Sequence, residues 1–123
     1  MTNYAISGDD KCYTPVYSKD DIKSKLKIVT FNTKISMANS DHKEVNGVHF
    51  NYQHGYIDIP SDIKAKTVIG IANVYIDYMY FNANVHLAGD GSGRLYYHVE
   101  AIGDYDYSSS QPTLSVSMLV LDD

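Results

Sequence analysis

The alternation of apolar and polar residues from Val29 onward restricts the fold of this chain more than any other feature. It is clearest over residues 29–37, 95–101 and 114–120. Successive side chains of a β-strand point to opposite faces, so each of these runs describes a strand with one buried face. Roughly seven or eight short runs of this kind predict a mainly β chain, folded as an antiparallel β-sandwich or a jelly-roll-like domain.

Turn residues separate the predicted strands. Asn46-Gly47 is a hairpin signal, and the glycine-rich residues 89–93 are expected to form a second hairpin loop because their backbone needs positive φ angles. We also expect His54-Gly55 to turn the chain between two short strands, and residues 39–43 to form a polar loop. These turns favour strands that pair with their neighbours along the chain.

Two runs carry more specific expectations. In residues 48–53 the even-numbered side chains form the apolar face and the odd-numbered ones, Asn51 among them, form the polar face. In residues 67–87 the alternation changes phase part-way along the run. This change predicts a bulge, or two strands joined by a tight bend, near Ala72-Asn73 or near Asp77-Tyr78.

A short helix is predicted over about residues 18–27, in front of the strands. Ser18 is a suitable N-cap because its hydroxyl accepts a hydrogen bond from a free N–H group of the first turn. Tyr17 precedes the cap and Ile22 occupies the fourth helical position, which is the spacing of a hydrophobic staple. We therefore divide the chain into an N-terminal arm with a short α-helix, residues 1–27, and a β-sandwich domain, residues 28–123.

This helix presents one narrow apolar stripe. Ile22, Leu26 and Val29 follow each other at i, i+4 and i+7, although Val29 equally suits the start of the first strand. A helix this short needs a packing partner. The stripe packs either on the β domain of its own chain or against further copies of the chain, in which case Tyr17 and the stripe form the contact between copies.

A family resemblance supports the second alternative. The segment Val16-Tyr17-Ser18-Lys19-Asp20-Asp21-Ile22-Lys23-Ser24-Lys25-Leu26 resembles a segment of bacteriophage tail-fibre and baseplate receptor-binding proteins. Asp21 replaces the glutamate that is common there, and Lys23 stands where an aspartate is frequent. The resemblance implies a homotrimeric virion protein that contacts other virion proteins through its N-terminal arm and takes part in recognition of the host surface.

Composition excludes several classes of function. The net charge is −5 and Arg94 is the single arginine, which argues against nucleic-acid binding because phosphate contacts need clustered basic residues. No apolar run approaches the length of a membrane span, so we expect no membrane insertion. The sequence opens on polar residues without a signal-peptide pattern, and we expect synthesis in the host cytoplasm and a final location in the virion. Cys12 is alone and forms no intrachain disulfide.

The sequence contains no recognisable catalytic or cofactor motif. We therefore expect a protein that is not an enzyme and that carries no cofactor and no metal. Asp104 and Asp106 have a spacing that suits a shared cation, but calcium needs six or more oxygens. His49, His86 and His98 lie on the polar faces of separate predicted strands, and they form a site only if those strands are neighbours.

One long polar loop is the predicted ligand site. It combines flat aromatic rings with hydroxyl and carboxylate groups, which suits saccharides. The residues that we predict to bind are Asp104, Tyr105, Asp106, Tyr107, Ser108 and Ser109.

Three functional hypotheses result. The first is a phage fibre or baseplate component that recognises a host-surface saccharide, with a virion decoration or connector protein without a ligand as its variant. The second is a monomeric carbohydrate-binding module or lectin. The third is a cytoplasmic enzyme, which no motif supports.

Overall fold

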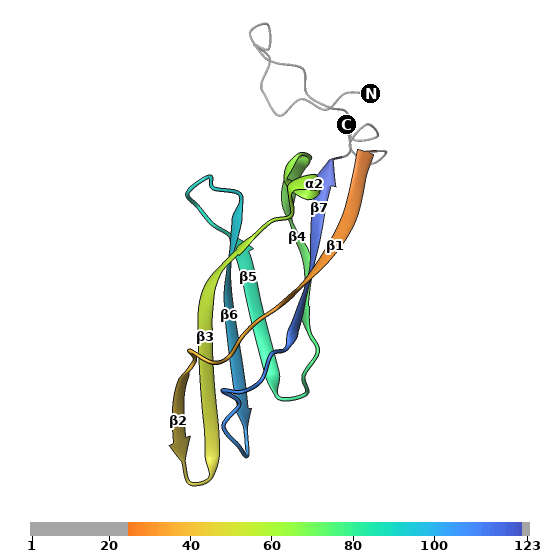
Figure 1. Cartoon of the computed structure of the whole chain (residues 1–123). Helices are drawn as coiled ribbons and strands as arrows, with labels where there is room; N and C mark the ends of the chain where they lie inside the picture. Colours follow the sequence, from red (N-terminus) through yellow and green to blue (C-terminus); the bar gives the residue numbers. More distant parts are fainter. Residues whose placement is uncertain (1–24, 122–123) are drawn as a thin grey trace, which may run out of the picture.

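The computed structural model describes residues 25–121, which form seven strands and one single-turn helix (Figure 1). The helix is α2 (Ser61–Lys64). The strands are β1 (Leu26–Lys34), β2 (Asp41–Val45), β3 (Val48–Asp58), β4 (Thr67–Ile76), β5 (Phe81–Leu87), β6 (Arg94–Gly103) and β7 (Thr113–Leu121). The prediction of a mainly β chain is confirmed. Within residues 25–121 no helix has the length and apolar character that a membrane span requires.

The strands form two antiparallel sheets. The three-stranded sheet has the order β1-β7-β4 and the four-stranded sheet has the order β2-β3-β6-β5. In Figure 1 the two sheets form separate layers, and the hairpin of β2 and β3 extends beyond the end of the three-stranded sheet. The predicted β-sandwich is confirmed.

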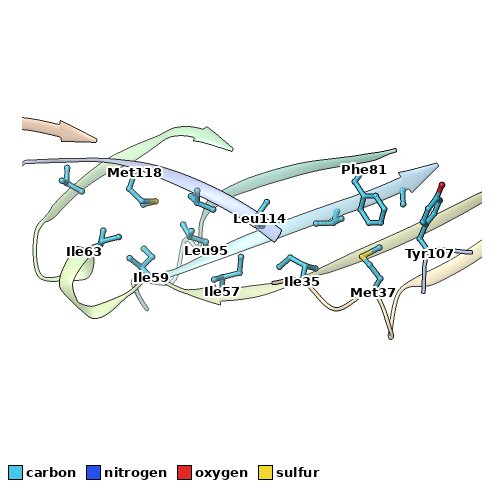
Figure 2. Close-up of a cluster of buried hydrophobic side chains, with 14 residues drawn as sticks. Ile35, Met37, Ile57, Ile59, Ile63, Phe81, Leu95, Tyr107, Leu114 and Met118 are labelled. Carbon is cyan, nitrogen blue, oxygen red and sulfur yellow. The ribbon is translucent and has the colours of Figure 1, made fainter. Parts of the chain in front are cut away.

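The core lies between the sheets and is formed by the apolar residues of the alternating runs in the sequence. In β7 every second residue from Leu114 to Val120 is fully buried, and Leu95 and Val99 of β6 are buried opposite them. In Figure 2, Ile63 of α2 lies at one end of this core, and Phe81 and Tyr107 lie at the other. Burial of such a continuous apolar cluster is the main source of stability for a sandwich of this size.

The predicted turns are largely confirmed. Asn46 and Gly47 join β2 to β3 with φ angles of 52° and 83°, the left-handed conformation that a two-residue hairpin requires. Residues 88–93 join β5 to β6 as a hairpin. The phase change in residues 67–87 has two causes, because β4 carries register shifts beside β7 and the chain then bends at residues 77–80 before β5 begins.

The predicted helix is wrong at its C-terminal end. Leu26 already belongs to β1, where it pairs with Leu121, and Val29 pairs with Met118 and packs against the core. Nine consecutive residues of β1 pair with β7, and this ladder takes the residues that we assigned to the end of the helix. Tyr17 and residues 18–24 of the predicted helix, Ile22 among them, lie outside the described residues. Lys25 is helical, as predicted.

Two loop predictions are also wrong. The chain does not turn at His54-Gly55, because β3 continues through both residues to Asp58. Gly55 allows a close approach there: a Cβ atom would lie 3.1 Å from the hydroxyl oxygen of Tyr97, so the Tyr97 ring would have to shift slightly to admit a side chain. Asp41 to Lys43 are not a loop either, since they pair with β3 as the first part of β2.

The two faces of residues 48–53 are the reverse of the prediction. Asn51 is 1% exposed and faces inward, whereas Val48 and Phe50 are exposed on the outer face. Burial of a polar amide is favourable only where its hydrogen bonds are satisfied. The partners of Asn51 are Ser40 and three residues of the distant loop 104–112.

Candidate functional site

Six aromatic and imidazole rings gather on the outer face of the four-stranded sheet. Residues at i, i+2 and i+4 of a strand point to the same side, so each strand contributes alternate residues to this face. We call these six residues the ring face; they are Tyr52, His54 and Tyr56 of β3, Tyr96 and His98 of β6, and His86 of β5.

Strand register brings these rings into contact. His54 lies opposite His98, and Tyr96 lies opposite both Tyr56 and His86. The ring centroids of Tyr56 and Tyr96 are 5.1 Å apart in an edge-to-face arrangement, and those of Tyr96 and His98 are 4.7 Å apart. His86 lies 5.4 Å from Tyr96. The result is a continuous aromatic surface across three neighbouring strands.

Two hydrogen bonds hold four of the rings in place. The hydroxyl of Tyr52 is 2.6 Å from Nδ1 of His98, and the hydroxyl of Tyr96 is 2.9 Å from Nδ1 of His54. Desolvation, followed by the nearby Tyr96 and Glu100, raises the pKa of Tyr52 above its usual value. The Tyr52 hydroxyl therefore keeps its proton at neutral pH and can serve as a hydrogen-bond donor.

A charged pair borders the ring face. The guanidinium of Arg94 lies 4.1 Å from the centroid of the Tyr56 ring, which is a cation–π contact. Arg94 donates through Nη2 to Asp90 and through Nε to the hydroxyl of Ser92, both at 3.0 Å. Asp90 also accepts from the backbone N–H of Ser92. Hydrogen bonds from the side chain and backbone of Ser92, followed by that from Arg94, lower the pKa of Asp90 to about 2. Its carboxylate is therefore ionised at neutral pH.

A hollow of about 340 Å³ adjoins this pair. Its walls are Tyr56, Tyr96 and His86 of the ring face together with Ala88, Gly89 and Asp90 of the β5–β6 loop. Its volume is at the lower end of the range for small-molecule pockets.

The predicted ligand-binding residues of the loop 104–109 differ in their exposure and contacts. Tyr105 is 61% exposed, and Asp104 and Ser109 are exposed as well. Tyr107 is only 7% exposed and belongs to the core, where it packs against Phe81 at a centroid distance of 5.3 Å. A buried ring offers no face to a saccharide, so the ring of Tyr107 acts in packing.

Asp106 and Ser108 of this loop bind the buried Asn51. Nδ2 of Asn51 lies 2.9 Å from Oδ1 of Asp106 and 3.2 Å from the hydroxyls of Ser108 and Ser40. Oδ1 of Asn51 accepts from the backbone N–H of Tyr107 at 3.0 Å. We call Asn51 and these four partners the Asn51 network. It anchors the loop to the sheet, so the polar groups of Asp106 and Ser108 are largely engaged within the protein.

We predict that Asp106 makes the stability of the fold sensitive to acid. Hydrogen bonds from Ser108 and Asn51 lower its pKa to about 2, whereas an aspartate in an unfolded chain has a pKa of about 3.9. The ionised group therefore stabilises the fold above about pH 4, and this contribution is lost as the pH falls towards 2.

Urea unfolding between pH 5 and pH 2 measures this effect. The free energy of unfolding should fall more steeply for the natural chain than for Asp106→Asn, which has no titrating group at this position. Asp90 contributes equally to both proteins and so cancels in the comparison. Parallel curves for the two proteins would contradict the prediction.

The structure brings only two of the three predicted histidines together. The rings of His86 and His98 are 6.3 Å apart on the ring face. His49 lies elsewhere, stacked on His42 at 5.0 Å with Nε2 of His42 2.8 Å from Nδ1 of His49. Within residues 25–121 no three histidine, cysteine or acidic side chains are arranged to hold a metal ion.

Sequence analysis missed the tyrosines of the ring face. The spacing of Tyr52, His54 and Tyr56 at i, i+2 and i+4 is visible in the sequence, as is that of Tyr96 and His98. We assigned Tyr52 to the apolar face of its strand, and we had no means of knowing that β3 and β6 are neighbours. A period-two run of Tyr and His is nevertheless a usable signal for such a face.

Comparisons with protein-family models, with curated proteins and with solved structures found no match to this chain.

Proposed function

We propose that this chain is a non-enzymatic saccharide-binding β-sandwich and that the ring face is its binding surface. The observation that carries the proposal is the contact among half-exposed tyrosine and histidine rings from three adjacent strands. A protein interior would be the usual location for such a cluster, since aromatic rings bury a large apolar surface. Its position on the outer face of a sheet favours a binding role.

The chemistry of the ring face suits sugars better than apolar ligands. The C–H groups of a pyranose pack against flat rings, and its hydroxyls need donors and acceptors at the edge of the same surface. The hydroxyl of Tyr56 and the free Nε2 atoms of the imidazoles supply both functions. Rings that are held by neighbouring hydrogen bonds lose little conformational freedom when a ligand binds, which favours affinity.

We expect Tyr96→Ala to abolish most saccharide binding. Tyr96 contacts four other members of the ring face, which makes it the centre of the surface. The dissociation constant should rise by about 10- to 100-fold, because tyrosines that a ligand covers at the centre of a binding surface contribute the largest energies. Tyr96→Phe keeps the ring and should show a smaller loss. A glycan array followed by calorimetry on the strongest ligand measures these changes.

Tyr75→Ala is the matched control. Tyr75 is 60% exposed and belongs to β4 in the other sheet, so its loss should leave binding unchanged. Equal affinity of the Tyr96→Ala variant and the natural chain would refute the ring face as the binding surface.

The assembly that we propose is a homotrimeric component of a phage fibre or baseplate, with its saccharide ligand on the host surface and its final location in the virion. The support for this assembly is the resemblance of residues 16–26 to tail-fibre and baseplate proteins. Exposed apolar side chains at the start of β1 and in β4, including Ile28 and Ile69, are compatible with contacts between copies.

Sedimentation equilibrium, combined with the glycan array, separates the candidates. A trimer that binds glycans is the expected result. A monomer that binds glycans would favour the lectin alternative, and a trimer that binds none would favour a decoration or connector protein.

A further inference from the structure

The hollow beside Asp90 differs from the rest of the ring face in its polar groups. Tyr56, Tyr96 and His86 form its aromatic walls, and the Asp90–Arg94 pair lies at its rim. A pyranose presents exactly two kinds of surface, C–H faces and hydroxyl edges, and both have partners here. We infer that this hollow binds the terminal, uncharged pyranose of a glycan chain, an inference that rests on the proposed function.

Asp90 is suited to accept hydrogen bonds from sugar hydroxyls. Each carboxylate oxygen has two acceptor positions, and the backbone N–H of Ser92, the hydroxyl of Ser92 and Nη2 of Arg94 use three of these four. One acceptor position therefore remains for a ligand. The side chain is half exposed and is held by its two partners, so it is already ordered before a ligand arrives.

The charges around the hollow disfavour an acidic sugar. Two basic groups lie near this end. Arg94 is already engaged with Asp90, Ser92 and the ring of Tyr56, and Lys64, which packs beside Gly93 of the loop, is not among the residues that line the hollow. Asp58 lies opposite Arg94 in the register of β3 and β6, and Glu100 acts electrostatically on Tyr52 at the other end of the ring face. A carboxylate in the hollow would meet Asp90, with no lysine or arginine among the residues that line the hollow.

The β5–β6 loop determines which part of the glycan chain occupies the hollow. Residues 88–93 form one wall of the hollow, whereas the ring face continues on the other side of Tyr96 to His98 and Tyr52. A chain end fits against the loop, and the following sugar residues extend over the remaining rings. The hollow therefore selects the sugar at the end of the glycan chain, and the rest of the ring face contributes to affinity for the sugars that follow.

The test uses an array of neutral oligosaccharides, each beside an analogue that ends in a uronic or sialic acid. The natural chain should bind the neutral members at least tenfold more tightly than the acidic ones. Gly89→Leu should block the hollow and weaken binding at least tenfold. No atom lies within 4 Å of a Cβ added at Gly89, so the variant should fold. Asp90→Asn should weaken binding to neutral ends and reduce the discrimination against acidic ends.

Gly70→Leu is the matched control, since a Cβ at Gly70 in the other sheet also meets no atom within 4 Å. Its affinity should equal that of the natural chain. Equal binding of acidic and neutral ends, or natural affinity of Gly89→Leu, would overturn the inference. If the inference about the hollow fails in this way but Tyr96→Ala still abolishes binding, the proposed function stands without the inference. If the natural chain binds no member of the array, both fail.

Discussion

Asn51→Leu should lower the free energy of unfolding by about 2–4 kcal/mol, although leucine has nearly the same size and belongs in a core. The substitution leaves the buried N–H of Tyr107 without its acceptor and removes the amide that faces Asp106, Ser108 and Ser40. An unsatisfied buried group costs more than the hydrogen bond contributed, so the apolar replacement does not compensate. Urea unfolding at neutral pH measures the change.

The control for this variant is Asn82→Leu, at an exposed position of β5. Its effect should stay within about 0.5 kcal/mol, as for most surface substitutions. A double-mutant cycle with Asp106→Ala then tests the mechanism. The changes in unfolding free energy should not add, because both residues belong to one hydrogen-bond network. An additive cycle, or a change below about 1 kcal/mol for Asn51→Leu, would show that the Asn51 network contributes little.

Leu95→Ala should cost about 2–5 kcal/mol of stability. Leu95 has no exposed surface and lies in the middle of the core between the two sheets, close to Ile57 and Leu114 (Figure 2). Removal of two methyl groups and one methine carbon loses their burial and leaves a cavity that a tightly packed core closes only in part. Thermal or urea unfolding should show a large fall in stability with the cooperative transition retained.

Leu87→Ala provides an internal comparison. Leu87 pairs directly with Leu95 across the β5–β6 ladder but is 40% exposed. The same substitution should therefore cost much less, about 1 kcal/mol. Similar losses at the two positions would contradict the burial that the fold assigns to Leu95.

The sequence was sufficient to predict the strands whose pattern is local. In β7, the alternation from Leu114 to Val120 by itself identifies the buried face, because one side of the strand is apolar throughout. The hairpin at Asn46-Gly47 was predictable for a similar reason, since few residues other than these adopt its left-handed conformations readily. Such features depend only on residues close together in the chain.

Other features depend on residues that are distant in the chain. Asn51 is buried because Asp106 and Tyr107 supply its hydrogen-bond partners, and the residues around it give no sign of them. The ring face likewise exists only because β6 lies between β3 and β5, which places Tyr96 beside Tyr56 and His86. The residue types of the candidate site and their spacing can therefore be read from the sequence. The contacts between those residues depend on the order of the strands in the sheet.

The central position of β7 has a consequence for the order of events during translation. The four strands of one sheet, β2, β3, β5 and β6, all precede residue 104 and can pair as soon as they leave the ribosome. β1 and β4, however, have no strand between them until β7 is synthesised. The nascent chain must therefore expose the apolar inner face of its first sheet to solvent until β7 emerges, a period in which aggregation competes with folding.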